Sequence, residues 1–441
     1  MTGESSPQLV RALGRWTLAA LVLNSIIGSG IFGLPSAIAG LVGSAAPFAY
    51  LFGAVGIGVL MAVMAEVSSR YRASGGQYLY ARDALGRFAG IQIGWFFLLV
   101  RLTSAAAALN LFVNYLGEFW PDATAGATRA TVIVVLLAAF ATINYRGVRL
   151  GAGFSNFFTV AKLVSLGAFI VAGLLLVNRA APPAAPVVAP GAGAWTDALV
   201  ALVFAFGGFE SALIPAAEVK NPRRDAPFAL GLGLAVVATV YFLIHLVAMW
   251  AVPALAGSSR PLADAARAFA GPTGAAAMAL AAMLSVVGWL SGAFVVMPRL
   301  IFALAEQRDF PAPLAAVHAR FRSPHLAILL WTVLVLGLAL SGGFLWNAIL
   351  AGVARLVTYG ATCAALLRLR RREPQADVWR APAGNLLAVL GIAFCFFLVL
   401  RMTGTHLAIM SAVAAVATIN WFVVRRRREP AGGNPPAAPL P

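Results

Sequence analysis

The sequence predicts an all-helical integral membrane protein with twelve spanning helices, two of which are interrupted near their middle. The chain has 441 residues, of which 61% are hydrophobic and only 11% are charged, a composition well outside the range of soluble globular domains. Apolar stretches recur along the chain at about the 20-residue length that a spanning helix needs. Glycines interrupt two of these stretches at corresponding places in the two halves of the chain.

Twelve such stretches are expected to cross the membrane. They cover residues 16–40, 43–66, 88–118, 127–145, 153–178, 196–218, 227–251, 272–304, 325–341, 344–367, 383–403 and 405–424.

The basic residues predict the orientation of these spans. The net charge is +17, and most of the 32 Lys and Arg residues cluster at every second loop. The positive-inside rule places these clusters and both termini in the cytoplasm, and leaves Arg129, Arg179, Arg260, Arg267 and Arg401 outside. The charge therefore reflects topology in a plasma (inner) membrane, with anionic lipid head groups rather than nucleic acid as its partner.

The first span contains three glycines and a proline within residues 24–35. A break at membrane depth frees N–H and C=O groups, each costing several kcal/mol unless it lines a cavity or meets a ligand. Residues Gly28 to Gly33 are therefore interpreted as a binding site, with a close helix–helix contact as the alternative. The doublet Gly207-Gly208 interrupts span six in the same way, and such a pair of interrupted spans indicates a transporter built from inverted repeats.

Lys162 lies about a third of the way into span five, too deep to reach the membrane surface easily. Ionisable groups at membrane depth are functional hypotheses by default. Because burial favours the neutral form of a lysine, Lys162 is a candidate to load and release a proton during transport. The alternative is a permanent charge that satisfies carbonyl groups of a broken helix.

Two arginines also fall within predicted spans. Arg101, near the middle of span three, keeps its proton and needs a carboxylate or a water-filled cavity; Glu210, Glu66 and a bound substrate are the available anions. Glu210 follows the second break and is interpreted as a proton acceptor or as the partner of Arg101, with a passive hydrogen-bonding role left open. For Arg355, in span ten, an internal ion pair that fixes helix packing is preferred.

Aromatic residues mark two further features. Trp289 lies in the middle of span eight between two glycines, where it either packs in the core or faces a cavity. Residues 73–86 are too polar to cross the membrane and predict a short amphipathic helix along the interface, anchored by Tyr78 and Tyr80.

The sequence contains no constellation that predicts an enzyme, a metal site or a cofactor. No Gly-x-x-x-x-Gly-Lys motif is present, and none of the four histidines has a Cys, Asp or Glu partner at metal-ligand spacing; they are His245, His318, His325 and His406. Transport driven by a gradient or by exchange is the function class that remains.

Four stretches, taken in order and at their spacings, resemble the amino acid, polyamine and organocation (APC) superfamily of transporters. They are Gly28-Ser29-Gly30-Ile31-Phe32, Gly75-Gly76-Gln77-Tyr78-Leu79-Tyr80, Lys162, and the stretch 206–224 that begins Phe206-Gly207-Gly208-Phe209-Glu210-Ser211. The resemblance covers nearly the whole chain. It implies two inverted five-helix repeats (16–178 and 195–371) and two peripheral helices (383–424), flanked by a cytoplasmic arm (1–15) and tail (425–441).

The resemblance also implies a substrate with an α-amino and an α-carboxylate group. The N–H groups of Ser29 and Gly30 would hold the carboxylate, and carbonyl groups of the two breaks would accept from the ammonium. Phe204 would gate the site, while Arg101 and Trp289 would line the side-chain pocket. The predicted binding residues are Ile26, Gly28, Ser29, Gly30, Arg101, Phe204, Phe206, Gly207 and Trp289, with Lys162 and Glu210 as coupling residues.

The sequence departs from the family pattern at three places. The doublet Gly207-Gly208 stands where many relatives have a bulkier first residue, which predicts a larger pocket or a looser gate. Arg101 replaces what is usually a small or neutral group. Lys162 occupies the place where sodium-coupled relatives of the fold bind an ion.

The resulting hypothesis is a secondary active transporter of an amino acid that works by alternating access, either proton-coupled or as an exchanger. Neutral or acidic substrates are favoured, because Arg101 and Lys162 would repel a second positive charge. A cationic amino acid or polyamine transporter or antiporter is the alternative, and a non-transporting amino acid sensor is a more remote one. The sequence leaves open whether the protein forms a homodimer.

Overall fold

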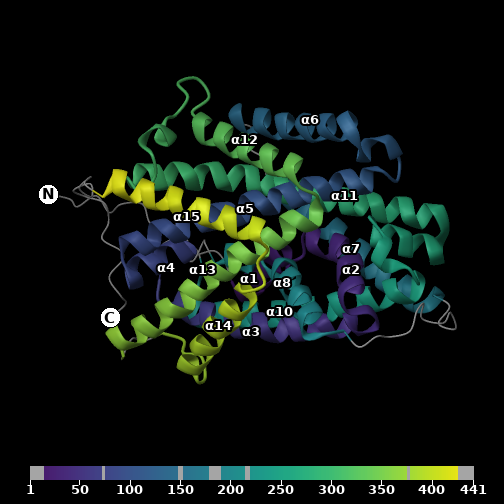
Figure 1. Cartoon of the computed structure of the whole chain (residues 1–441), viewed down its shortest axis with the longest axis horizontal. Coiled ribbons are helices and arrows are strands. Elements are labelled where there is room, and N and C mark those ends of the chain that lie inside the picture. The colour runs from purple at the N-terminus through teal and green to yellow at the C-terminus, as the bar shows by residue number, and fades with distance from the viewer. Residues whose placement is uncertain are drawn as a thin grey trace.

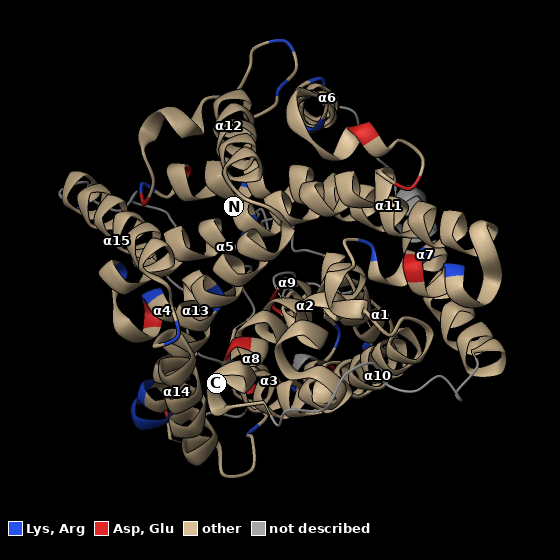
Figure 2. Ribbon diagram, turned by 45° about the vertical axis from the view of Figure 1, so that its right-hand side comes forward, with Lys and Arg blue, Asp and Glu red and all other residues tan. Residues whose placement is uncertain are grey.

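The computed structural model of the chain describes residues 14–71, 75–147, 152–177, 190–213, 219–374 and 378–425. Its regular elements in these ranges are all helices (Figure 1). Nine helical stretches of this described part are long and apolar enough to cross a membrane, and two more apolar helices are shorter. Charged residues are sparse along the ribbons (Figure 2). The architecture is that of a multi-pass membrane protein.

Each predicted span coincides with a helix or with a pair of helices. Span one consists of α1 (Arg15–Ile26) and α2 (Ser29–Val42), and span six of α8 (Ala192–Phe206) and α9 (Phe209–Ala212). The unbroken spans are α3 (Ala46–Ser69), α5 (Arg87–Leu116), α6 (Gly126–Tyr145), α7 (Ala152–Leu176), α10 (Pro222–Ala251), α11 (Pro261–Glu306), α12 (His325–Ser341), α13 (Phe344–Arg372), α14 (Gly384–Val399) and α15 (Gly404–Val424). The connections include the short 3₁₀ helices η1 (Gly43–Ala45), η2 (Pro121–Thr124), η4 (Leu255–Gly257) and η5 (Ala312–Ala315). The crossing number of twelve, the inverted repeats and the domain boundaries stay predictions.

The interrupted helices lie near the centre of the molecule, as both views show (Figures 1 and 2). The half-helices α2 and α8 pack against each other, and α13 packs against both α5 and α8. Small residues allow these close approaches, since a Cβ atom on Gly352 of α13 would lie 2.7 Å from the carbonyl oxygen of Val200 in α8. The core therefore forms around the two breaks.

The helix α11 begins earlier than the sequence predicts. Residues Pro261 to Ala270 form a helical segment where a loop was expected, and Gly271, with φ of +68°, separates this segment from the rest of α11. Proline suits the first turn of a helix because its missing N–H has no partner there in any case. The extracellular connection predicted before span eight is therefore partly helical.

The polar segment before span three forms the expected helix, α4 (Gly76–Leu85), but its tyrosines are not interfacial anchors. Tyr78 and Tyr80 are buried. The Tyr78 hydroxyl donates a hydrogen bond to the buried carboxylate of Asp309, to which Arg87 also donates over 2.7 Å. The prediction of membrane-anchoring tyrosines is therefore wrong, because α4 packs its aromatic face onto protein and joins the polar end of α11.

Candidate functional site

The first break is held together by a lysine from another helix. Helix α1 ends at Ile26, and Ile27 and Gly28 connect it to α2. Lys162 of α7, which is 5% exposed, donates from Nζ to the carbonyl oxygens of Asn24 (2.9 Å) and Ile27 (2.6 Å). These bonds give Lys162 the carbonyl-satisfying role that was the alternative in the sequence prediction, and its role in proton coupling stays a prediction.

The second break requires glycine at Gly208. This residue has φ of +118°, a conformation that other residues rarely adopt, and a Cβ atom on it would lie 2.2 Å from the carbonyl oxygen of Ser25. Its N–H donates to Oε2 of Glu210 over 2.8 Å, and the hydroxyl of Tyr359 donates to the same oxygen over 2.9 Å. The close approach of Gly208 to the Ser25 carbonyl brings the backbones of the two breaks into direct contact.

Tyr241 of α10 connects the ends of the two half-helices. Its hydroxyl lies 3.1 Å from the carbonyl oxygen of Ile26 and 3.2 Å from that of Ala205. Its single hydrogen is shared between these two acceptors. One buried side chain thus ties the carboxyl end of α1 to that of α8.

A buried cluster of two arginines and one glutamate lies behind the second break. Oε1 of Glu210 lies 3.3 Å from Nε of Arg355 and 3.9 Å from Nη2 of Arg101. Arg355 also donates to the carbonyl oxygen of Phe204 over 3.4 Å. The ion pair predicted for Arg355 is present, and Glu210 is the carboxylate closest to both arginines in the part of the chain described.

Glu66 does not belong to this cluster, so its prediction as a partner of Arg101 is wrong. Its Oε1 accepts from Nε of Arg370 over 2.8 Å, and its Oε2 accepts from the Ala381 N–H over 2.9 Å. Arg70 adds a further pair at 3.3 Å. Glu66 therefore joins α3 to the end of α13 and to the start of α14, away from the breaks.

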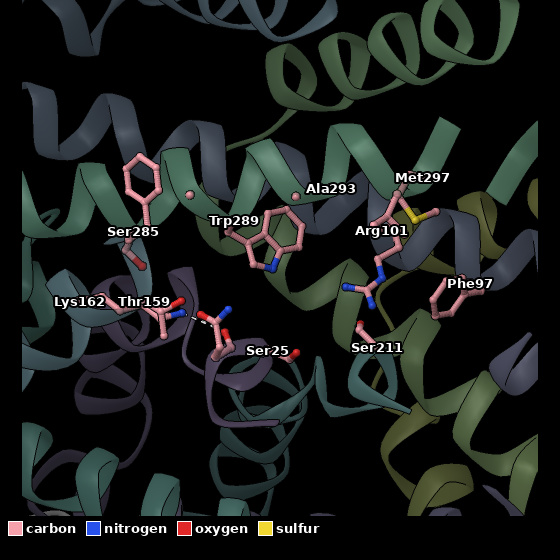
Figure 3. Close-up of a pocket in the computed structure, with 15 residues that line it drawn as sticks. Ser25, Phe97, Arg101, Thr159, Lys162, Ser211, Ser285, Trp289, Ala293 and Met297 are labelled. Atoms are coloured by element: carbon pink, nitrogen blue, oxygen red, sulfur yellow. Dashed lines mark hydrogen bonds between the residues drawn. The ribbon is translucent and has the colours of Figure 1, made fainter. Parts of the chain in front are cut away.

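Two adjoining cavities meet at the breaks. The larger, of about 440 Å³, lies between α1, α5, α7 and α11, and Figure 3 shows the side chains that line it. It runs along α11 from Ser285 past Trp289 to Met297. The smaller, of about 20 Å³, lies at the amino-terminal end of α2 and shares Ser25, Arg101 and Trp289 with the larger one. The inner space holds about one water-sized group, so most of a ligand would lie in the outer one.

Most of the predicted site residues meet at these cavities. Those that line the inner cavity are Ile26, Gly28, Ser29, Gly30, Arg101, Phe204, Gly207 and Trp289. Lys162 lines the outer cavity. Glu210 lines neither cavity, and it pairs with Arg101 and Arg355, which do line them.

Phe206 is not brought to either cavity. It is fully buried, and its ring packs against the rings of Tyr50 and Tyr241, with centroid distances of 6.5 Å and 5.3 Å. Phe206 follows Phe204 by two residues on a helix, which places the two side chains on different faces. The prediction of Phe206 as a binding residue is corrected on this ground.

The glycine doublet does not enlarge the pocket in the way that the sequence predicts. A Cβ atom on Gly207 would lie 2.2 Å from Nη1 of Arg355, so the guanidinium fills the space that a side chain would occupy. Gly30 likewise faces protein, since its Cβ atom would lie 2.9 Å from Cα of Ala205. Gly28 is the glycine with room for a side-chain carbon, since a Cβ atom there would make only ordinary van der Waals contacts, at 3.8 Å from the carbonyl oxygen of Ile26 and 3.9 Å from Cδ1 of Trp289.

Sequence reasoning missed four residues of the site, namely Ser25, Ser211, Tyr241 and Tyr359. The two serines line the outer cavity. The two tyrosines bond to the breaks from helices that carry no glycine interruption. A tyrosine in the middle of a span, away from the membrane interface, is the signal that could have identified them.

Phe204, which lines the inner cavity, packs against a second aromatic side chain. The Phe344 ring meets the Phe204 ring edge-on at 6.1 Å, and it lies so close to Gly33 that a Cβ atom there would be 2.4 Å from it. The outer cavity reaches Phe97 of α5 and Met297 of α11 at one end and Lys162 of α7 and Ser285 of α11 at the other.

Discontinuous helices around a buried cavity, inside a bundle of apolar helices, define a membrane transport protein. The amino acid permease family profile matches residues 13–424, and the chain belongs to this family of the APC superfamily. It is 29% identical to an uncharacterized transporter of Mycobacterium tuberculosis, over 97% of this chain and 95% of the relative. It is also similar to the serine/threonine exchanger of Bacillus subtilis (26% identity, 88% and 90% coverage) and to the methylthioribose transporter of the same organism (24% identity, 96% and 95% coverage). These relatives are named as transporters or as an exchanger.

Proposed function

We propose that this protein is a secondary active transporter that moves an amino acid across the plasma membrane by alternating access, either coupled to protons or as an exchanger. The observation that carries the proposal is the inner cavity at the amino-terminal end of α2, which opens into a cavity of about 440 Å³. Free N–H groups and the helix dipole favour a carboxylate at such an end. The amino acid head group would bind there, with its side chain in the outer cavity.

The direction of access supports an inward-facing state. Phe204, which lines the inner cavity, packs against Phe344 at the start of α13, and the outer cavity reaches Phe97, towards the side where α5 begins. The positive-inside rule assigns that side to the cytoplasm, along with both termini. An outward-facing state would need the contact between α2 and α8 to open and the outer cavity to close.

The charges of the site favour neutral or acidic substrates over cationic ones. Arg101 and Lys162 both line the outer cavity, whereas no acidic residue lines either cavity in the part of the chain described. Two like unit charges about 6 Å apart repel each other by roughly 3 kcal/mol at an effective dielectric constant near 20. Glu210, which could offset this repulsion, lies closer to Arg355 than to Arg101.

Uptake into proteoliposomes tests the proposal. The purified protein is reconstituted and offered a panel of labelled amino acids, with and without a pH gradient and with and without amino acids trapped inside. Serine, threonine, arginine, putrescine and methylthioribose belong in the panel because of the relatives and of the alternative substrates. We expect saturable uptake of an amino acid that responds to the pH gradient or to trapped substrate. Binding without uptake would instead indicate a sensor, and uptake confined to methylthioribose or putrescine would contradict the proposal.

A further inference from the structure

The buried arginine that lines both cavities has no hydrogen-bond partner within the described residues. Arg101 is 7% exposed, and its Nε is buried without an acceptor. Its nearest carboxylate oxygen, Oε1 of Glu210, is 3.9 Å from Nη2, beyond the range of about 3.2 Å for an N–H···O hydrogen bond. The guanidinium carbon of Arg101 also lies 5.1 Å from the centroid of the Phe97 ring. A guanidinium carries five donors, so leaving them unused in a buried place is costly.

The glutamate nearest to Arg101 is already occupied. Glu210 pairs with Arg355 at 3.3 Å and accepts hydrogen bonds from the Gly208 N–H and the Tyr359 hydroxyl. Lys162, the second cation of the outer cavity, uses its ammonium on two backbone carbonyls, and these carry no net charge. The site therefore holds more positive charge than its single carboxylate offsets.

The unused donors point into the space where a substrate would lie. Figure 3 shows the Arg101 guanidinium directed into the outer cavity, where it lies near Ser211 and points towards the side of the cavity that Trp289 lines. The Ser211 hydroxyl is buried and has no hydrogen-bond partner either. The two side chains together offer the donors that a carboxylate takes, and arginine suits this task because its planar fork binds both oxygens.

We infer that the transported amino acid carries a second anionic group, as aspartate and glutamate do, and that Arg101 is the residue that recognises it. The inference rests on the proposed function, since it assumes that the α-carboxylate binds at the amino-terminal end of α2. The side-chain carboxylate would then reach Arg101 and Ser211 in the outer cavity. Its charge would also balance the excess positive charge of the site.

Matched pairs of acids and amides test the inference in proteoliposomes. Uptake of labelled aspartate and glutamate is compared with uptake of labelled asparagine and glutamine, which have the same shape without the charge. In the wild type we expect the acids to have KM values about 10- to 100-fold lower than the amides, the difference expected for a hydrogen bond between charged groups. Arg101→Gln should remove most of this preference by raising the KM of the acids, with that of the amides nearly unchanged.

Arg267→Gln is the matched control. Arg267 lies in the helical segment before Gly271, remote from the cavity lining, and pairs with Glu118, so its loss should leave the acid-to-amide ratio unaltered. Equal KM values for acids and amides in the wild type would overturn the inference. An Arg101→Gln variant in which the KM rises equally for acids and amides would also overturn it. If Arg101→Gln fails to fold, the wild-type ratio still decides, and Arg101→Lys supplies a charged replacement. Absence of uptake for every amino acid would contradict the proposed function itself.

Discussion

Gly28 and Gly30 stand two residues apart in the first break, and the structure predicts opposite outcomes when each receives a side chain. A Cβ atom on Gly30 would lie 2.9 Å from Cα of Ala205, and backbone there cannot move without separating α2 from α8. Overpacking of this kind costs about 1–3 kcal/mol. Gly30→Val should therefore lower the apparent melting temperature in detergent and reduce the yield of folded protein, whatever its effect on binding.

Gly28→Ala should have the reverse effect. Its Cβ atom would lie 3.8 Å from the carbonyl oxygen of Ile26 and 3.9 Å from Cδ1 of Trp289, which is ordinary van der Waals contact. The added methyl group borders an inner cavity of about 20 Å³, which holds about one water-sized group. The variant should melt like the wild type but lose about tenfold or more in substrate affinity, the cost of displacing one charged hydrogen bond.

The pair is measured by melting in detergent and by KM for uptake. A Gly30→Val protein with wild-type melting would refute the close contact between α2 and α8. A Gly28→Ala protein with wild-type KM would show that the substrate head group binds elsewhere. Gly28, rather than Gly30, is therefore the position at which a substitution tests the head-group site without disturbing the packing of α2 on α8.

Two further variants address the residues that hold the breaks. Lys162→Ala leaves the carbonyl oxygens of Asn24 and Ile27 without a donor, at about 1–3 kcal/mol each, so it should lower the melting temperature. If Lys162 is also the coupling group, the variant should lose accumulation driven by a pH gradient while exchange of substrate persists, and wild-type gradient-driven accumulation would exclude the coupling role. Tyr241→Phe removes the hydroxyl that bonds the carbonyl oxygens of Ile26 and Ala205, at a cost of about 1 kcal/mol or more, and should slow transport. An unchanged KM would show that the variant still binds substrate. Unchanged turnover would show that this link between α1 and α8 does not affect transport.

The sequence predicted the helices well because composition and glycine placement are local properties. Apolar length located the long helices, and glycines located both interruptions to within a few residues, since an interrupted helix needs residues that tolerate unusual backbone geometry. The errors fall where tertiary contacts decide. The amphipathic pattern of residues 73–86 predicted Tyr78 to be an interfacial anchor, but its hydroxyl donates a hydrogen bond to the buried Asp309. The helical segment before Gly271 was missed because it is too short to register as a span.

The sequence predicted which residues form the site better than it predicted which of them pair with each other. Arg101, Glu210 and Arg355 were recognised because charges at membrane depth are rare, yet the sequence offered Glu66 as an equal partner. Glu66 and Glu210 are both acidic residues within predicted spans, and only the tertiary packing, which pairs Glu66 with Arg370 and Glu210 with Arg355, distinguishes them. The sequence also does not fix the rotation of a helix about its axis, so it cannot tell which way a side chain points. Phe206, predicted to bind substrate, is instead fully buried.

The glycine doublet illustrates how a departure from a family pattern acquires a physical meaning. Gly207 lacks a side chain, and the guanidinium of Arg355 lies in the space so released, with Nη1 only 2.2 Å from where a Cβ atom would be. This placement brings Arg355 to Glu210, and the close pair leaves Arg101 as the cation whose donors are unused. A small residue at 207 thus leaves room for Arg355 beside Glu210, the same carboxylate that lies 3.9 Å from Arg101. The excess charge of the cavity follows from that arrangement, and with it the expectation that the substrate brings a carboxylate of its own.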